Sequence, residues 1–208
     1  MISDYVIISK IKYWKEAVKI KVFDFDNTIY RGESSFDLVV FMIKNNKKIL
    51  LYLPSIFINM IKYKMCMVEK AQLLKKINDF MKVIIMNENE VNALVKRFWK
   101  KKIHKLDRNM LKRIKKDDVI ITAGPDFLIH GIKKLINTDN IISSEIDYEK
   151  FEVKYFNFGD NKVKRYKELY GNRRIDCLYT DSYNDKALMD ISDKVYIVKK
   201  GRLKLLSR

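Results

Sequence analysis

The sequence predicts an α/β fold in which a parallel sheet core is interrupted by an inserted, all-helical cap domain. Three observations lead to this prediction. Short β-branched runs alternate with helical patterns from residue 115 onward. Another short apolar run, at Val22 to Phe25, is broken by aspartates near the start of the chain. Between these parts, about 70 residues carry apolar side chains at spacings of three and four, with no strand pattern.

Composition limits the classes of function without choosing one. A chain of 208 residues with 48% hydrophobic residues is long enough for one core with an insertion. The net charge of +17 suits nucleic acid, an anionic membrane surface or a phosphorylated substrate. The same abundance of lysine, with only 6 Gly and 2 Pro, also fits an AT-rich coding background. Cys66 and Cys177 form neither a disulfide framework nor a metal-ligand pattern, so we expect a reducing cytoplasm.

Residues 1–20 have no clear periodicity, and we treat them as an N-terminal segment without an assigned structure. Lys10, Lys12 and Lys15 interrupt its apolar run, so no export signal is expected. The most hydrophobic window, Ile49 to Ile61, is about 13 residues long, whereas a membrane-spanning helix needs about 20. We therefore expect no transmembrane segment.

The first strand is predicted at Val22 to Phe25, with Asp24 at its carboxyl end and Asp26 just beyond. Two carboxylates at this spacing are costly on a buried strand, because each needs a cation or strong hydrogen bonds. Open α/β sheets hold their ligands at the carboxyl ends of their strands. A functional role for both aspartates is therefore the expected reason for their presence.

The cap is predicted to occupy residues 34–114. Residues 31–34 indicate a turn, after which Ser34 or Ser35 would cap a helix. Asn87 and Glu90 resemble a capping box of a later helix. Apolar residues recur at helical spacing at Leu74, Ile77, Met81 and Ile84, and at Val91, Leu94, Val95 and Phe98. The cap aromatics, which include Phe41, Tyr52, Phe57 and Phe98, are expected to form its core.

Residues 21–33 and 115–208 are predicted to form the core. After residue 115, we expect a strand at 119–122 and then a helix that is opened by Pro125 or Asp126 and carries Phe127, Leu128, Ile132 and Leu135. A strand at Ile141 and Ile142 and a helix at 162–170 follow. The last elements are a strand at 175–180, a short helix and a final strand at 195–198. This alternation predicts a Rossmann-like parallel sheet with right-handed crossovers. Asp24, Thr122 and Thr180 would then lie at the same edge of that sheet.

These residues resemble the haloacid dehalogenase-like hydrolase superfamily. The sequence DFDNT matches the D-x-D-x-T motif of that family, and Thr122 at a strand end matches its second motif. Lys162 in GDNKVKRY matches the third motif, and DSYND matches the acidic fourth. Asn27 stands where relatives commonly have Gly. The helical insertion is similar to the cap of the subgroup that contains phosphoserine phosphatase.

The resemblance implies a role for each motif residue. Asp24 would attack phosphorus, and Asp26 would act as general acid and then as general base. The second aspartate favours a phosphatase over a dehalogenase. A Mg²⁺ ion would be bound by Asp24, the backbone carbonyl of Asp26 and Asp181, with Asp185 binding through water or orienting the lysine. The expected phosphate-binding groups are the side chains of Thr122 and Lys162 and backbone N–H groups near Phe25, Asn27 and Ala123.

Several questions stay open at the level of sequence. Lys154 and Lys164 lie near Lys162, and either is an alternative phosphate-binding lysine. The isolated His104 and His130 are interpreted as structural or surface residues. The sequence does not indicate an oligomeric state.

The leading hypothesis is a Mg²⁺-dependent phosphomonoester phosphatase that acts on a small phosphorylated metabolite enclosed by the cap. Glu33 lies nine residues after Asp24, where phosphoserine phosphatases carry an acid that binds the substrate's amino group. One alternative is a lipid-phosphate phosphatase at a membrane surface, with Ile49 to Ile61 as an interfacial helix. Another is a basic nucleic-acid-binding protein on the same fold, although no recognised nucleic-acid motif is present.

Overall fold

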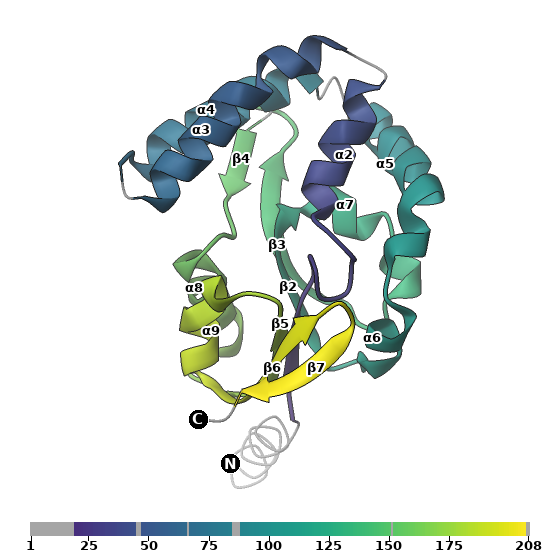
Figure 1. Ribbon diagram of the computed structural model, residues 1–208, viewed down its shortest axis with the longest axis vertical. Helices are drawn as coiled ribbons and strands as arrows, with labels where there is room; N and C mark the ends of the chain where they lie inside the picture. The colour runs from purple at the N-terminus through teal and green to yellow at the C-terminus, as the bar shows by residue number, and fades with distance from the viewer. Residues whose placement is uncertain (1–18, 45–46, 66, 85–87, 151, 207–208) are drawn as a thin grey trace, which may run out of the picture.

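The described strands form one seven-stranded sheet, in which neighbouring strands follow the order β4-β3-β2-β1-β5-β6-β7 (Figure 1). The computed structural model describes residues 19–44, 47–65, 67–84, 88–150 and 152–206. Most of the N-terminal segment, residues 1–18, therefore lies outside the described part. The strands are β1 (Lys21–Asp24), β2 (Val119–Pro125), β3 (Asn140–Asp147), β4 (Glu152–Tyr155), β5 (Ile175–Thr180), β6 (Ser192–Lys199) and β7 (Arg202–Leu206).

The five inner strands are parallel, and β1 lies at their centre. Val22 of β1 pairs with Val119 of β2 on one side and with Leu178 of β5 on the other. This register aligns the carboxyl ends of the three strands at one edge of the sheet. The edge strands differ, because β4 is antiparallel to β3 and β7 is antiparallel to β6. The predicted Rossmann-like parallel core is confirmed.

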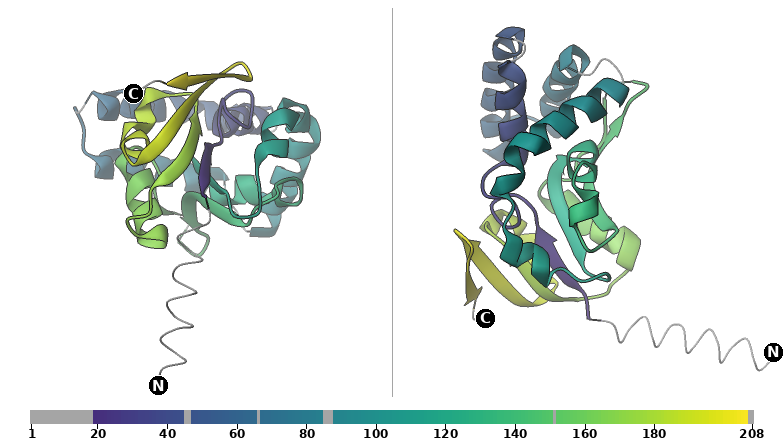
Figure 2. Two further views of the ribbon diagram at one scale, coloured as in Figure 1. Left: turned by 90° about the horizontal axis from the view of Figure 1, so that it is seen from below. Right: turned by 90° about the vertical axis from the view of Figure 1, so that its right-hand side faces the viewer.

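Helices cover both faces of this sheet. They are α2 (Ser34–Ile43), α3 (Leu53–Lys64), α4 (Lys70–Ile84), α5 (Glu88–Lys102), α6 (Arg108–Arg113), α7 (Asp126–His130), α8 (Asp160–Tyr170) and α9 (Lys186–Asp190). Seen from below, α8 lies on one side of β1 and the α5–α6 region on the other (Figure 2). Among the described residues, five of the helices, α2 to α6, follow one another between β1 and β2, which agrees with the predicted helical insertion. Within the described residues, no helix is long and apolar enough to cross a membrane.

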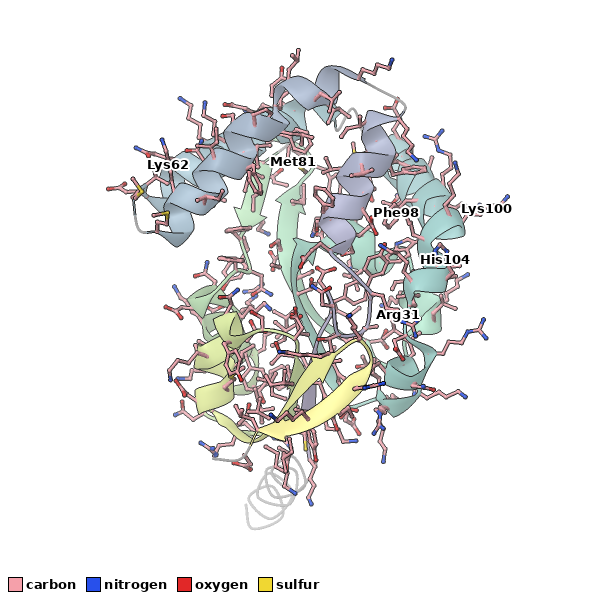
Figure 3. All side chains as sticks on the ribbon, in the orientation of Figure 1. Arg31, Lys62, Met81, Phe98, Lys100 and His104 are labelled. Carbon is pink, nitrogen blue, oxygen red and sulfur yellow. The ribbon has the colours of Figure 1, made fainter. Side chains whose placement is uncertain are left out.

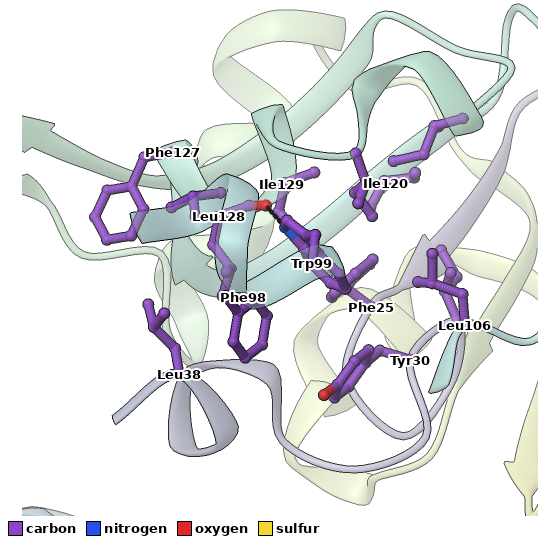
Figure 4. Close-up of a cluster of buried hydrophobic side chains, with 14 of the residues drawn as sticks. Phe25, Tyr30, Leu38, Phe98, Trp99, Leu106, Ile120, Phe127, Leu128 and Ile129 are labelled. Atoms are coloured by element: carbon purple, nitrogen blue, oxygen red, sulfur yellow. Dashed lines mark hydrogen bonds between the residues drawn. The ribbon is translucent and has the colours of Figure 1, made fainter. Parts of the chain in front are cut away.

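The insertion shares a hydrophobic core with the sheet. Phe25 from the loop after β1 packs edge-on against Trp99 of α5, with ring centroids 6.4 Å apart. The Trp99 Nε1–H donates a hydrogen bond to the backbone oxygen of Leu128, at 2.8 Å (Figure 4). Gly131 permits this close approach, because a Cβ atom there would lie 2.4 Å from a methyl carbon of Val95. The base of the insertion is thus held directly against the core by close packing.

Some local predictions were wrong. The helix that begins at Asp126 ends at His130 and is followed by a 3-10 turn at Lys133–Leu135, so it does not continue to Leu135 as one helix. The final strand is β7, and neither β7 nor β4 was predicted. Glu33 rather than a serine occupies the N-cap position of α2, and it makes no side-chain cap bond. The suggested capping box at Asn87 falls outside the described residues.

The aromatic residues of the cap divide into two groups. Phe41 and Phe98 are buried and pack edge-on, with centroids 5.9 Å apart, and Tyr52 packs against the same cluster. Phe57 was expected in this core, but 65% of it is exposed. Leu53 and Ile56 of α3 pack against this cluster instead, and the apolar surface of the helix extends past them to the exposed Phe57.

Candidate active site

Asp24, Lys162 and Asp185 meet at the carboxyl edge of the sheet. Asp24 ends β1, Lys162 lies in the first turn of α8, and Asp185 follows β5. The Lys162 Nζ donates to Asp24 Oδ1 at 2.7 Å and to Asp185 Oδ1 at 2.8 Å. All three side chains are buried. One ammonium group therefore bridges two carboxylates from distant parts of the sequence.

The charges of this group are only partly balanced. Burial, and to a smaller extent the negative charge of Asp185, raise the pKa of Asp24 to about 8 against the opposing effect of Lys162. Burial acts to lower the pKa of Lys162, but Asp24 and Asp185 outweigh burial and raise it. Lys162 therefore stays protonated at neutral pH. With Asp26 also nearby, the site has more carboxylates than cations, and it would be stabilised by further positive charge.

Asp26 lies at the N-terminus of α2. Its Oδ1 accepts a hydrogen bond from the backbone N–H of Ser34 at 2.6 Å, so Asp26 satisfies an N-terminal donor of the helix from a distance of eight residues. Burial raises the pKa of Asp26 to about 6, while the bond from Ser34 works in the opposite direction. This carboxyl can therefore exchange protons near neutral pH.

The turn between Asp26 and α2 depends on Asn27. Asn27 has a φ of 56°, in the left-handed region that Asn adopts more readily than most residues, which explains why it can stand where relatives have Gly. Its backbone N–H donates to Gly32 O at 3.0 Å, and its side-chain Nδ2 donates to Glu33 Oε1 at 2.8 Å. Asn27 thus holds the exposed Glu33 beside the entry to α2.

Thr122 and Ala123 lie at the end of β2, the strand next to β1. The buried Thr122 Oγ1 accepts a hydrogen bond from Gly124 N at 2.9 Å. The backbone oxygen of Ala123 accepts from the Ser144 hydroxyl at 2.8 Å. Asn157 donates to Thr122 O at 2.8 Å and thereby ties the loop before α8 to β2. The loop that leads to Lys162 is fixed against the Thr122 strand.

Asp181 immediately follows β5 and is partly buried. Burial raises its pKa, and the next contribution comes from the negative charge of Glu33, so these two acidic groups from distant loops lie near one another. Within the described residues, no three acidic, His or Cys side chains form a ready-made metal cluster. A metal ion here would therefore also need backbone oxygen or water as ligands.

The three neighbouring lysines occupy different environments. Lys162 is buried and contacts Asp24, whereas Lys164 is exposed. Lys154 Nζ is 3.9 Å from Glu145 Oε2 and is 69% exposed at its side chain. His104 and His130 are both exposed, as expected of residues outside the site.

Sequence reasoning placed Thr180 at this edge of the sheet without giving it a role, and it missed Asn157. The Thr180 hydroxyl donates to Asp185 Oδ2 at 2.8 Å, so both oxygens of Asp185 are engaged and its orientation is fixed. Thr180, the last residue of its strand, immediately precedes the acidic motif, and this position was a usable signal. Asn157 gives no comparable signal, because its role depends on the packing of a loop against a strand 35 residues away in sequence.

A second network of hydrogen bonds links the two chain segments that join the sheet to the helical insertion. Asp37 of α2 accepts hydrogen bonds from the Tyr30 hydroxyl and from the Nζ atoms of Lys102 and Lys105. Although burial acts to raise the pKa of Asp37, its bonds from Lys105 and Tyr30 lower it overall. Asp37 therefore joins the segment that leaves β1 to the segment that returns from α5.

The family comparison agrees with this geometry. A family model described as haloacid dehalogenase-like hydrolase matches residues 22–190, which include all the motifs described above. The chain belongs to the haloacid dehalogenase-like hydrolase family. The family predicted from the motifs is therefore confirmed. The sequence matches no curated protein.

Solved structures show the same fold at low sequence identity. A protein of unknown function from Bordetella pertussis Tohama I is 16% identical, with a TM-score of 0.63, over 83% of this chain and 86% of that one. A phosphoserine phosphohydrolase-like protein from Francisella tularensis is 17% identical, with a TM-score of 0.56, over 86% of each chain. The second likeness agrees with the predicted subgroup at the level of fold.

Proposed function

We propose that this haloacid dehalogenase-like hydrolase is a Mg²⁺-dependent phosphomonoester phosphatase that works through an aspartyl-phosphate at Asp24. The observation that carries the proposal is the pair of aspartates at the end of β1. Asp24 accepts from the Lys162 ammonium but has a pKa raised to about 8 by burial, so a further cation would favour its ionised, nucleophilic form, whereas Asp26 has a pKa of about 6 beside the N-terminus of α2. Two carboxyl groups with different environments suit two different roles in one reaction.

In the first step, an oxygen of Asp24 attacks phosphorus, and the bond between phosphorus and the substrate's ester oxygen breaks. Asp26 donates its proton to that leaving oxygen, which departs as an alcohol. Lys162 holds a phosphoryl oxygen with its ammonium, while Asp185 and Thr180 keep Lys162 in place. The Thr122 hydroxyl and the backbone N–H groups of Asn27 and Ala123 are assigned to the remaining phosphoryl oxygens.

In the second step, Asp26 is ionised and takes a proton from a water molecule, which attacks phosphorus. The bond between phosphorus and Asp24 breaks, inorganic phosphate leaves, and both aspartates return to their starting states. A pKa of about 6 suits this alternation, because neither protonation state of Asp26 is far from neutral pH.

Phosphatases of this family typically use a divalent metal. The excess of carboxylates over cations around Asp24 is the feature of this chain that fits such an ion. Asp24, Asp181 and the backbone carbonyl of Asp26 would supply oxygen ligands, and Asp185 would act mainly by orienting Lys162. When bound, Mg²⁺ would neutralise charge on the phosphoryl oxygens and so reduce their repulsion by the aspartates.

A small phosphorylated metabolite is the proposed substrate class. Glu33 is exposed beside the site, and its position favours a substrate that carries an amine. Lipid phosphate remains a second candidate, and the exposed apolar side chains of α3 are the observation that favours it. Basic nucleic-acid binding is not favoured by any contact at this site.

The test is a phosphatase screen of purified protein over a panel of phosphorylated metabolites, with Mg²⁺ and with EDTA. We expect phosphate release only with the metal. Asp24→Asn is expected to lower kcat by several orders of magnitude while the protein stays folded, because the amide keeps the shape but cannot act as nucleophile. Retention of more than about a tenth of the wild-type rate would exclude Asp24 from that role.

A further inference from the structure

The segment from Leu38 to Val68 is strongly basic. It contains no Asp or Glu over 31 residues and carries five lysines, at 44, 47, 48, 62 and 64. Asp37 precedes the segment and Glu69 follows it. The local charge of +5 therefore has no internal counter-charge within this stretch of the sequence.

The same segment exposes large apolar side chains. Leu51 is 79% exposed and Phe57 is 65% exposed, so neither is a core residue. We call the following residues the α3 patch: Leu50, Leu51, Phe57, Ile58, Ile61, Met65 and Met67. Isolated exposed apolar residues are common on proteins, but a group of this size along one helix and its two flanking segments indicates an interaction surface.

Three of the patch residues lie on α3, whereas Leu50 and Leu51 precede the helix and Met65 and Met67 follow it. Phe57, Ile58 and Ile61 follow the spacing i, i+1 and i+4, which places them on the same side of a helix. Leu53 and Ile56 lie at one border of the same apolar arc and pack against the hydrophobic cluster of the cap. The helix is therefore held by one part of its apolar surface and exposes the rest, at Phe57, Ile58 and Ile61.

The position of α3 leaves that face accessible. The α3–α4 pair lies at the end of the molecule opposite β6 and β7 (Figure 1). Lys62 is exposed on α3 next to Ile61, and its side chain is drawn at this outer end (Figure 3). Lys44 and Lys47, which precede α3, are exposed as well. Cations therefore lie at the border of an apolar surface.

We propose that the α3 patch docks reversibly on the surface of an anionic lipid bilayer, with α3 lying in the plane of the interface. Apolar side chains bordered by lysines match the acyl boundary and the negative headgroups of such a surface. A helix of 12 residues is too short to span the bilayer. The inference does not depend on the proposed catalytic activity.

Other occupants fit the charges less well. A second copy of the chain would bring an identical +5 segment and a net charge of +17 against the first. Nucleic acid would engage the lysines but would leave the aliphatic side chains of the patch without a partner. An anionic membrane would offer partners to both parts of the surface: its headgroups to the lysines and its acyl boundary to the apolar side chains.

The test is flotation of the full-length protein with vesicles of phosphatidylcholine alone and with about 30% phosphatidylglycerol added. We expect binding to the anionic vesicles and little binding to the neutral ones. The double variant Phe57→Asp with Ile58→Asp should weaken binding by at least roughly tenfold, because it removes two apolar contacts and adds negative charge. Lys62→Ala should weaken it about fivefold, as expected for one lysine near an anionic surface.

Two further variants make the result specific. Phe57→Ser with Ile58→Ser removes the apolar contact without adding charge, and it should also weaken binding. Leu169→Asp is the matched control, because Leu169 is 58% exposed on α8, outside the patch, and this change should leave binding close to that of the unchanged protein. Thermal unfolding of each variant shows that the fold is retained.

The proposal is overturned if the unchanged protein does not bind anionic vesicles. It is also overturned if Leu169→Asp weakens binding as much as the patch variants do, or if the serine variant binds like the unchanged protein, since charge alone would then account for binding. Light scattering gives a separate check. A dimer that the Asp variants convert to monomers would show that a second copy covers the patch.

Discussion

At the scale of single residues, Asp26 meets two demands that work against each other. It caps α2 through the backbone N–H of Ser34, which favours the ionised carboxylate, while burial favours the neutral acid and raises its pKa to about 6. An ionised Asp26 therefore weakens the folded state at neutral pH. This loss of stability falls at the residue that the proposed reaction requires to exchange a proton.

We predict that Asp26→Asn increases the free energy of unfolding at pH 7.5 by roughly 1 to 3 kcal/mol in the presence of EDTA. The pKa of Asp26 rises from 3.8 unfolded to about 6 folded, so wild-type stability falls as pH rises between these values. Asn does not titrate, and its oxygen can still cap α2. The gain should thus be absent near pH 3.5 and complete above about pH 6.5. Urea titrations at several pH values measure it, and a gain that does not change with pH would contradict the explanation.

The motif residues of the site were predictable because β1, β2 and β5 are adjacent and parallel. Once these strands are recognised, Asp24, Thr122 and Asp185 must approach one another, and the structure places Lys162 among them. The supporting residues were not predictable in the same way. Asn157 and the Asp37 network act through contacts between segments far apart in sequence, and no local pattern marks them.

At the scale of elements, the inner strands were predicted and the edge strands were not. A buried parallel strand is apolar on both faces, so β2 and β5 stand out in the sequence. The edge strands have the sequences EVKY in β4 and RLKLL in β7, where charged residues alternate with apolar ones in short runs. Such runs are typical of protected sheet edges and resemble surface loops in sequence. The early end of α7, at His130, was also missed. Val95 and Trp99 of α5 approach Gly131 closely just after that end, and no local sequence pattern marks this contact.

Asp37 gives the element-scale prediction, because it connects α2 to the end of α5. We expect Asp37→Asn to lower the free energy of unfolding at pH 7 by about 1 to 3 kcal/mol, since charge-assisted bonds from Lys102 and Lys105 are weakened. The pKa of Asp37 is lowered in the folded protein, so its contribution is present above the unfolded pKa and is lost as pH falls through the folded pKa. The variant should therefore approach wild-type stability in acid.

The measurement is again urea unfolding as a function of pH. Asp79→Asn, an exposed position on α4, is the matched control and should change stability by less than about 0.5 kcal/mol. A similar loss in both variants at pH 7 would mean that the Asp37 network does not hold these elements together.

At the scale of the whole molecule, the helical cap is held to the core at its base and at its outer part. At its base, Trp99 packs on the core and donates to Leu128 O of α7, and its outer part is held to the β4 edge. There the backbone N–H of Val153 donates to Asn78 Oδ1 at 3.0 Å, and Lys82 pairs with Glu152 at 3.2 Å. One of the two strands that sequence analysis missed, β4, thus supports the cap. Neither contact involves a residue assigned to the chemical step.

This division of roles implies that substrate choice and chemistry can be separated by mutation. Glu33, positioned by Asn27 at the base of the cap, is the residue expected to recognise an amine on the substrate. We predict that Glu33→Gln raises KM for amino-bearing phosphoesters by about tenfold to a hundredfold, the loss expected from one charge-assisted hydrogen bond of roughly 1.5 to 3 kcal/mol. A small aryl phosphate, which has no amine to recognise, should be hydrolysed nearly as before.

Steady-state kinetics on the two substrates, measured for wild type and Glu33→Gln under the same metal concentration, decide among three explanations. A selective rise in KM supports recognition of an amine by the carboxylate. Equal losses on both substrates would show that Glu33 acts by supporting the turn at Asn27, because a displaced turn would disturb Asp26 for every substrate. No loss on either substrate would remove the amine from the proposed substrate class. The lipid-phosphate alternative would then lead, because the exposed face of α3 would be the remaining feature that bears on substrate choice.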